Sequence, residues 1–390
     1  MYIGYTQEHE ALRDELRAYY DRLLTPEIVS QLAVSASVGP VVRQVVRQMG
    51  TDGWLGIGWP TQYGGQGRSA LEQFIFFDES MRAGAPVPML TINTVGPTIM
   101  EFGDQAQKDF FLPPILRGEV HFCIGYTEPG SGTDLASLKT KAVADGDEYV
   151  INGQKIFTSL ASDADYIWLA TRTSDEGKKH RGISIFAIDM DTPGIEVVPM
   201  KLIGDHDINQ CFFENVRVPA SRLVGGENNG WTLITNQLNY ERVTLCSPGI
   251  IDRSLEDVRR WAQNAKLADG TRVIDKDWVQ ANLARVAARL EFVRLINWKV
   301  AWTATQGKLD VADASSVKVF GTEFYQEAFR LLMEVIGQRA YITDGSGDTV
   351  LDARLERYYR SLLILTFGGG TNEIQRDLIA MFGLGLPKSR

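Results

Sequence analysis

The 390-residue sequence has little cysteine. Its three cysteines, Cys123, Cys211 and Cys246, are widely spaced and form no CxxC pair. An odd number at this spacing is typical neither of a disulfide framework nor of a zinc site. The four histidines also lack the spacing of a metal site. We therefore expect three reduced and mostly buried thiols and no bound metal.

Long hydrophobic runs are also missing. No uninterrupted apolar segment reaches the roughly 18 residues that a membrane span requires, so none is expected. Charged residues begin at Glu8, and no basic segment followed by an apolar one precedes them, which disfavours a secretory signal. We expect a cytoplasmic protein. The formal net charge of −9 disfavours general binding to nucleic acid, although a local basic patch could bind a phosphorylated ligand.

The length and composition are those of a soluble globular protein with two or three domains or one large layered unit, since 44% of residues are hydrophobic and 23% charged. Apolar residues recur at three- and four-residue spacing through most of the first third. This pattern predicts helices over 6–24, 38–49, 70–81 and 97–116. We expect Pro113-Pro114 to kink or divide the last of these.

The pattern changes near residue 121 to short segments rich in β-branched and aromatic residues, separated by Gly, Asp and Asn. They predict strands over 139–143, 148–151, 166–171, 183–188, 195–199 and 210–218. No βαβ alternation appears, and the glycine loop 130–132 lacks the strand and helix that a dinucleotide fingerprint requires. Helical periodicity returns and predicts helices over 231–246, 255–264, 278–305, 312–337 and 351–365.

These patterns predict an α+β fold in three parts. The expected parts are an N-terminal α-helical domain over 1–120, a middle antiparallel β domain over 121–224 and a C-terminal α-helical domain over 225–390.

Two segments carry side chains suited to binding a ligand. Segment 123–134 reads Cys-Ile-Gly-Tyr-Thr-Glu-Pro-Gly-Ser-Gly-Thr-Asp, and its glycines and hydroxyls allow close approach and hydrogen bonding. Segment 152–159 reads Asn-Gly-Gln-Lys-Ile-Phe-Thr-Ser. Taken alone, the first also fits an ordinary polar loop and the second a tight hairpin turning at Asn-Gly.

In this order and spacing the two segments resemble the flavin-binding signatures of the acyl-CoA dehydrogenase family, and the resemblance extends over essentially the whole chain. It implies an FAD whose isoalloxazine ring lies between the β domain and the C-terminal helices. It also implies that Thr133 contacts both cofactor and acyl-CoA. The positions implied to contact the flavin are Ile124, Gly125, Tyr126, Thr127, Thr133, Phe157, Thr158, Ser159, Gly369 and Thr371.

The family reaction needs a base that removes the proton α to the thioester carbonyl, and a carboxylate in an apolar cavity suits this role. Many members carry that glutamate near the C-terminus, at the position that Gly369 occupies here. A glycine cannot act as a base, and Glu373 matches a polar flavin contact instead. A minority of the family places the base on an earlier helix, where Glu241 matches it. Asn239 and Arg242 then match positions of the substrate pocket. The alternative for Glu241 is an exposed helical acid or a salt-bridge partner.

The segment Lys178 to Arg181 forms a basic loop. It fits a solvated hairpin tip, or a contact with the phosphates of CoA.

Two contacts that homotetrameric relatives offer to a neighbour's FAD are missing here. An arginine is absent around Asn264 and Ala265, and Glu334 stands where the family has glutamine. A carboxylate facing a diphosphate is unfavourable. The chain thus resembles the base-carrying subunit of the heterotetrameric acyl-CoA dehydrogenases of bacterial steroid side-chain degradation, which implies a paralogous partner subunit. Lys266 or Arg272 filling the gap in a homotetramer is the alternative.

The expected function is therefore α,β-dehydrogenation of a bulky acyl-CoA, perhaps a steroid side-chain thioester, with electrons leaving through an electron-transfer flavoprotein. Two alternatives are a non-catalytic partner that supports another subunit's site, and a flavin oxidase or monooxygenase on the same fold.

Overall fold

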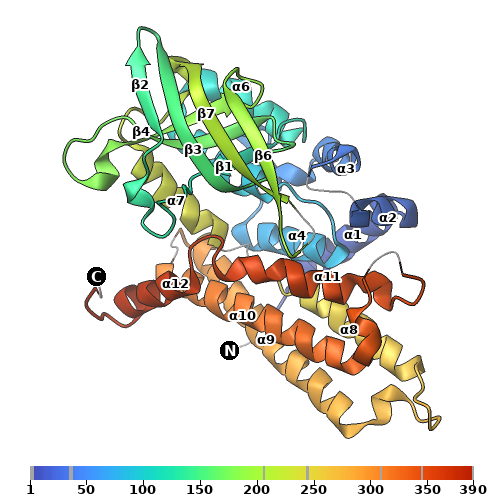
Figure 1. Cartoon of the computed structure of the whole chain (residues 1–390). Helices are drawn as coiled ribbons and strands as arrows, with labels where there is room; N and C mark the ends of the chain where they lie inside the picture. The colour runs from blue at the N-terminus through green and yellow to red at the C-terminus, as the bar shows by residue number, and fades with distance from the viewer. Residues whose placement is uncertain are drawn as a thin grey trace.

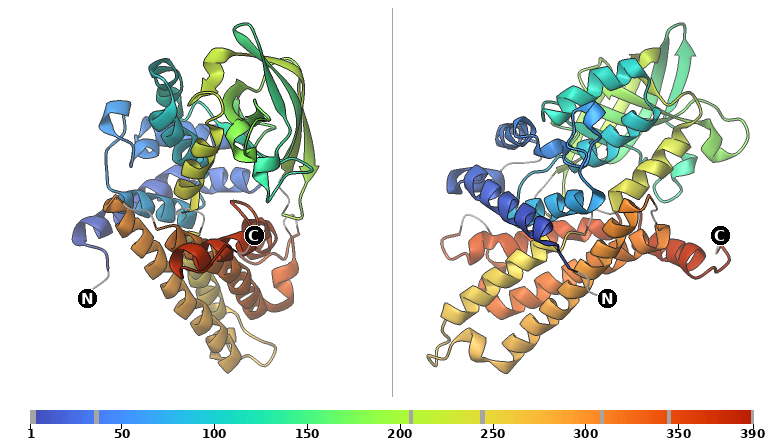
Figure 2. Two further views of the ribbon diagram at one scale, coloured as in Figure 1. Left: turned by 90° about the vertical axis from the view of Figure 1, so that its left-hand side faces the viewer. Right: turned by 180° about the vertical axis from the view of Figure 1, so that it is seen from behind.

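The computed structural model describes residues 4–34, 38–204, 207–242, 246–307, 310–343 and 346–388. The side chains of residues 34, 207 and 238–242 lie outside this description. Helices precede and follow a central β domain, which confirms the predicted fold (Figure 1). The long C-terminal helices extend beneath the other two domains (Figure 2).

Most N-terminal helices lie within the predicted ranges, although a further helix forms over 26–34, and short side chains fix where several of them begin. Thr6, Ser69 and Asp104 each accept a hydrogen bond from a backbone amide in the first turn. The helices of this domain are α1 (Gln7–Leu23), α2 (Pro26–Val34), α3 (Pro40–Thr51), α4 (Ala70–Ala83), α5 (Gly96–Phe102) and α6 (Gln105–Leu116).

The predicted division of helix 97–116 at its prolines is wrong. The chain breaks at Gly103–Asp104 instead, where Asp104 accepts from the Gln107 amide at 2.8 Å and the Gln107 side chain caps in return. Pro113 and Pro114 lie in the last turns of α6, which continues through them.

The middle domain is an eight-stranded sheet in the order β6-β7-β3-β2-β4-β5-β8, with β1 paired to β4. Most pairs are antiparallel as predicted, but β1 runs parallel to β4, and β2 also pairs with β4 in parallel at one position. The four residues of β1 are too few for the alternation that identifies a strand in sequence. The strands are β1 (Phe122–Gly125), β2 (Lys141–Asp145), β3 (Glu148–Ser159), β4 (Tyr166–Arg172), β5 (Ile183–Asp189), β6 (Ile195–Lys201), β7 (Asp207–Pro219) and β8 (Leu223–Val224).

The reading of Asn152-Gly153 as a tight hairpin turn is also wrong. Both residues lie inside β3, which continues to Ser159. The Asn152 side chain accepts from the Asn215 amide of β7 at 2.8 Å. Asn152 and Gly153 therefore form a bulge in the pairing of β3 with β7 rather than a turn. The chain reverses earlier, at Gly146, whose φ is 66°.

The C-terminal domain buries one core between α8, α9 and α10, with Val258, Val286 and Phe329 fully enclosed. No described helix is long and apolar enough to cross a membrane. The helices of this domain are α7 (Gly230–Arg242), α8 (Gly249–Asn264), α9 (Asp277–Thr305), α10 (Val311–Ile336), α11 (Arg354–Ser361) and α12 (Asn372–Leu378).

Candidate functional site

The first predicted flavin segment leaves strand β1 and contacts helix α7. The Tyr126 hydroxyl donates to the side-chain oxygen of Gln237 and accepts from the Trp168 indole at 3.2 Å. Gln237 is fully buried. Position 241 lies about one helical turn beyond Gln237 on α7. The side chains of Glu241, Asn239 and Arg242 themselves lie outside the described residues.

A buried ion pair holds the two predicted flavin segments together. The Lys155 ammonium lies 2.8 Å from a carboxylate oxygen of Glu128 and 3.2 Å from the carbonyl oxygen of Tyr126. Burial lowers the pKa of Lys155 to about 8, although the charge of Glu128 acts in the opposite direction. The Ile156 amide also donates to the Thr127 carbonyl at 2.9 Å. Each half of the pair lies in a different segment, so the pair fixes their relative position.

The same carboxylate orders the glycine loop behind Thr127. Glu128 accepts from the amides of Thr140 at 2.8 Å and Lys139 at 2.6 Å. Burial raises the pKa of Glu128, but the charge of Lys155 and these hydrogen bonds outweigh that effect, so the pKa is lowered overall. The Glu128 carboxylate is therefore a structural anion whose oxygens are bound by Lys155 and the backbone amides.

The second flavin segment ends strand β3 in an irregular backbone. Phe157 has a φ of 59°, which is uncommon for a residue with a side chain, and its ring is 57% exposed. Thr158 is buried, and Ser159 is exposed. Asn209 of β7 donates to the Thr158 carbonyl at 3.0 Å, which fixes the strand next to the bulge. The segment thus presents an aromatic ring and, two residues later, a hydroxyl.

The glycine-rich segment before α12 is held from α10. Lys318 is fully buried, and its ammonium donates to the carbonyl oxygens of Thr366 at 3.0 Å and Gly370 at 2.7 Å. Gly369 and Gly370 adopt φ values of 69° and 92°, where a Cβ atom would introduce strain. The Thr371 hydroxyl caps α12 by accepting from the Ile374 amide at 3.3 Å.

Thr133 and the basic loop lie close together. Thr133 is exposed, and the next residue, Asp134, pairs with Lys179 at 3.1 Å. The His180 ring lies 6.0 Å from the ring of Trp231 in the first turn of α7. The basic loop is therefore placed between the Thr133 segment and α7.

The residues around the missing FAD contacts lie near the C-terminal ends of α8 and α10, whereas Lys318 lies near the start of α10. Asn264 is exposed at the end of α8, and Glu334 is exposed on α10, where it accepts from Asn282 at 3.0 Å. Arg272, which could fill the gap, is paired with Asp275 at 2.7 Å.

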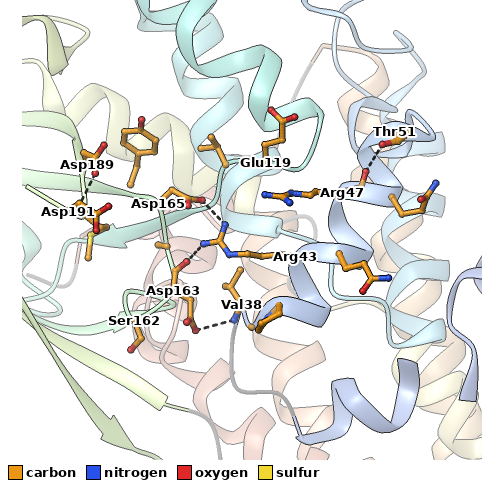
Figure 3. Close-up of a pocket in the computed structure, with 18 residues that line it drawn as sticks. Val38, Arg43, Arg47, Thr51, Glu119, Ser162, Asp163, Asp165, Asp189 and Asp191 are labelled. Carbon is orange, nitrogen blue, oxygen red and sulfur yellow. Dashed lines mark hydrogen bonds and ion pairs between the residues drawn. The ribbon is translucent and has the colours of Figure 1, made fainter. Parts of the chain in front are cut away.

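A polar cavity of about 1090 Å³ contains none of the predicted site residues (Figure 3). It lies between α3 and the loops that follow β3 and β5. Arg43 crosses it to pair with Asp165 at 3.1 Å and to donate to the Asp163 carbonyl oxygen. Asp165 also accepts from the His121 amide at 2.7 Å. These contacts attach the N-terminal domain to the loop after Ser159.

The described residues fit a flavin at the predicted place. The Gln237 amide nitrogen and the Gln375 amide oxygen are both buried and have no hydrogen-bond partner within the described protein. They offer one donor and one acceptor, as the edges of an isoalloxazine ring require. The exposed Phe157 ring offers an apolar face.

Sequence reasoning missed Gln237, Lys155, Glu128 and Lys318, which organise the site. Lys155 carried a usable signal, since it lies four residues after Ile151 and therefore on the same face of a strand, where a lysine requires a buried partner. Gln237 and Lys318 lie in amphipathic helices without such a signal.

Known proteins match the chain throughout. It matches the acyl-CoA dehydrogenase N-terminal domain over 6–119, the middle domain over 123–216 and the C-terminal domain over 228–384. It is 54% identical to the acyl-CoA dehydrogenase FadE26 of Mycobacterium tuberculosis over the full length of both chains. The crystal structure of the ChsE4–ChsE5 complex from the same organism contains a chain with a TM-score of 0.94 and 54% identity, and both chains are covered completely. The Tcur3481–Tcur3483 steroid ACAD gives a TM-score of 0.94 at 46% identity, again over both full lengths.

The fold and the matches define a flavoenzyme-type dehydrogenase architecture. The chain belongs to the acyl-CoA dehydrogenase family, as its sequence motifs predicted.

Proposed function

We propose that this chain is the base-carrying subunit of an FAD-dependent heteromeric dehydrogenase, and that it introduces an α,β double bond into the CoA thioester of a steroid side chain. The observation that supports this most directly is the contact of Tyr126 with Gln237, together with the glycine at position 369. The contact brings helix α7, which carries position 241, against the predicted flavin segment.

In the proposed reaction the carboxylate of Glu241 takes the proton from the carbon α to the thioester carbonyl. Bound FAD would accept the hydride that leaves the β carbon. Tyr126, Thr127 and Ser159 would orient the ring through hydrogen bonds, and Phe157 would cover one of its faces. Thr133, Asn239 and Arg242 would hold the thioester. A carboxylate beside such a ring and an acyl chain is poorly solvated, which raises its pKa into the range of a general base.

The proposed partner is a paralogous subunit, as in the ChsE4–ChsE5 and Tcur3481–Tcur3483 complexes that the chain resembles. Glu334 and the exposed Asn264 support this, because neither can neutralise the diphosphate of a neighbouring FAD. The partner would supply those contacts. The proposed electron acceptor is an electron-transfer flavoprotein.

Co-expression with paralogous candidates tests the proposal. The purified complex is assayed with CoA thioesters of steroid acids that differ in side-chain length and with straight-chain thioesters, using a dye acceptor and, separately, oxygen. We expect turnover of a steroid thioester with the dye and little with oxygen. Faster turnover with oxygen would indicate an oxidase, and preference for a straight-chain thioester would contradict the steroid assignment. Activity that survives loss of Glu241 would indicate a supporting subunit.

A further inference from the structure

A buried arginine joins two loops at the end of the middle domain. Arg172 ends strand β4 and is 8% exposed. Its guanidinium donates to the carbonyl oxygens of Ala136 at 2.6 Å, Leu138 at 3.3 Å and Lys179 at 2.5 Å. Three backbone acceptors from two loops thus share one planar donor group, which suits arginine and no other side chain.

Within the part of the chain that the structure describes, no other hydrogen bond or ion pair between these two loops is as well buried. The pair between Lys179 and Asp134 also links them, but its side chains are 67% and 61% exposed and contribute little. The backbone is tight where the second loop returns to the sheet. A Cβ atom on Gly182 would lie 1.7 Å from the carbonyl oxygen of Ser174 and 3.1 Å from the Arg172 guanidinium. The loop that contains Gly182 and the Arg172 side chain therefore pack together in only one arrangement.

This arrangement gathers positive charge beside Thr133. Lys178 and Arg181 are exposed on the second loop, and no described acidic side chain forms an ion pair with either. His180 on the same loop contacts Trp231 of α7. A ligand that passes between Thr133 and α7 would meet these cations. Lysine and arginine bind phosphate groups strongly.

We propose that Arg172 is a positioning residue that holds the Thr133 segment and the basic loop 178–181 in one arrangement, and that this arrangement receives the phosphates of the CoA nucleotide. The proposal rests on the proposed function for the class of substrate. Arg172 itself is buried behind the loops and acts through them. Lys178 and Arg181 carry the charges that face the ligand.

The test compares ligands with and without the nucleotide. Binding of coenzyme A and of pantetheine to the FAD-loaded complex is measured by isothermal titration calorimetry for the native enzyme and for Arg172→Gln. We expect the variant to bind coenzyme A about tenfold more weakly and pantetheine only slightly more weakly, since the Thr133 segment also loses part of its support. Equal weakening of both ligands would indicate a general structural role, and unchanged coenzyme A binding would remove the proposal.

The matched control is Arg217→Gln, since Arg217 lies on β7 of the same sheet but is exposed and pairs with Asp145 and Glu148. It should leave both affinities unchanged. If Arg172→Gln does not fold, Lys178→Ala/Arg181→Ala decides, because both side chains are exposed and their loss should not unfold the domain. Coenzyme A binding that is undiminished in this double variant overturns the proposal. The result does not depend on proton transfer, so it stands apart from the assignment of Glu241.

Discussion

Lys318 and Gly370 are joined by a 2.7 Å hydrogen bond from the buried ammonium of α10 to the carbonyl oxygen of the glycine-rich segment. About two turns further along α10, the Tyr325 hydroxyl donates to the Ser247 carbonyl oxygen, shortly after helix α7. A Cβ atom on Gly321 would lie 2.4 Å from the Cys246 side chain, so α10 and this connection also pack closely. One face of α10 therefore supports both the glycine-rich segment and the chain at Cys246 and Ser247, which follows helix α7.

Replacing Lys318 tests this support. Lys318→Met should lower the free energy of unfolding by about 3 kcal/mol or more, because buried carbonyl oxygens lose their donors. It should also reduce FAD content, since the glycine-rich segment loses its anchor. Thermal unfolding and flavin absorbance measure the two effects. Lys299→Met is the control, since Lys299 is exposed and pairs with Asp313 on the surface. Equal stability of the two variants would contradict the assigned role.

The flavin placement depends on hydroxyls from both segments. Thr127→Val should weaken FAD binding by roughly 1–3 kcal/mol, because a buried flavin acceptor loses its donor. Adding Ser159→Ala should shift the flavin spectrum, since the predicted contact lies near the reactive part of the ring. FAD content and visible absorbance of the double variant provide the measurement. Full FAD content with an unshifted spectrum would show that the ring lies elsewhere.

The partner requirement predicts weak FAD binding by the chain alone. Losing two charge-assisted hydrogen bonds to a diphosphate, at roughly 1.5–3 kcal/mol each, weakens binding by a factor on the order of hundreds or more. The region of Asn264 and Ala265, and Glu334, offer no replacement. Purification of the chain alone and with a paralogue, followed by flavin and chain stoichiometry, tests this. We expect about one flavin per pair of unlike chains. A fully active homotetramer with one FAD per chain would exclude the heteromer.

The buried His121 side chain should make the free energy of unfolding fall at acidic pH. Burial lowers the pKa of His121 from 6.5 to about 4, and the positive charge of Arg43 acts in the same direction. The unfolded chain therefore binds a proton at a higher pH than the folded one. The resulting stability is present above pH 6.5 and is lost as pH falls toward 4, by on the order of 3 kcal/mol. Denaturant unfolding across this range should show a weaker pH dependence for His121→Gln. Equal slopes for His121→Gln and the native protein would contradict the assignment.

The sequence predicted the long helices because their apolar periodicity is strong, as in α9 and α10, and the β domain because its strands alternate. It could not predict that Asn152-Gly153 stays within a strand, since the partner Asn215 is distant in sequence. The motif segments were recognised as motifs. The contacts that support them were not recognised, because Lys155 meets Glu128 only after the middle domain folds. Tyr126 meets Gln237 only after the middle and C-terminal domains pack together.

The most direct test of the account is the rate of flavin reduction in the complete complex that carries Glu241→Gln. Stopped-flow absorbance measures this rate after the complex is mixed with the preferred acyl-CoA. Glutamine keeps the shape of the side chain but cannot accept the α-proton. We predict that FAD stays bound and that the reduction rate falls by about three orders of magnitude or more. Glu373→Gln, on an exposed residue in the first turn of α12, should retain most of the native rate. A near-native rate for Glu241→Gln, with loss of reduction in Glu373→Gln, would contradict the account and assign the base to Glu373.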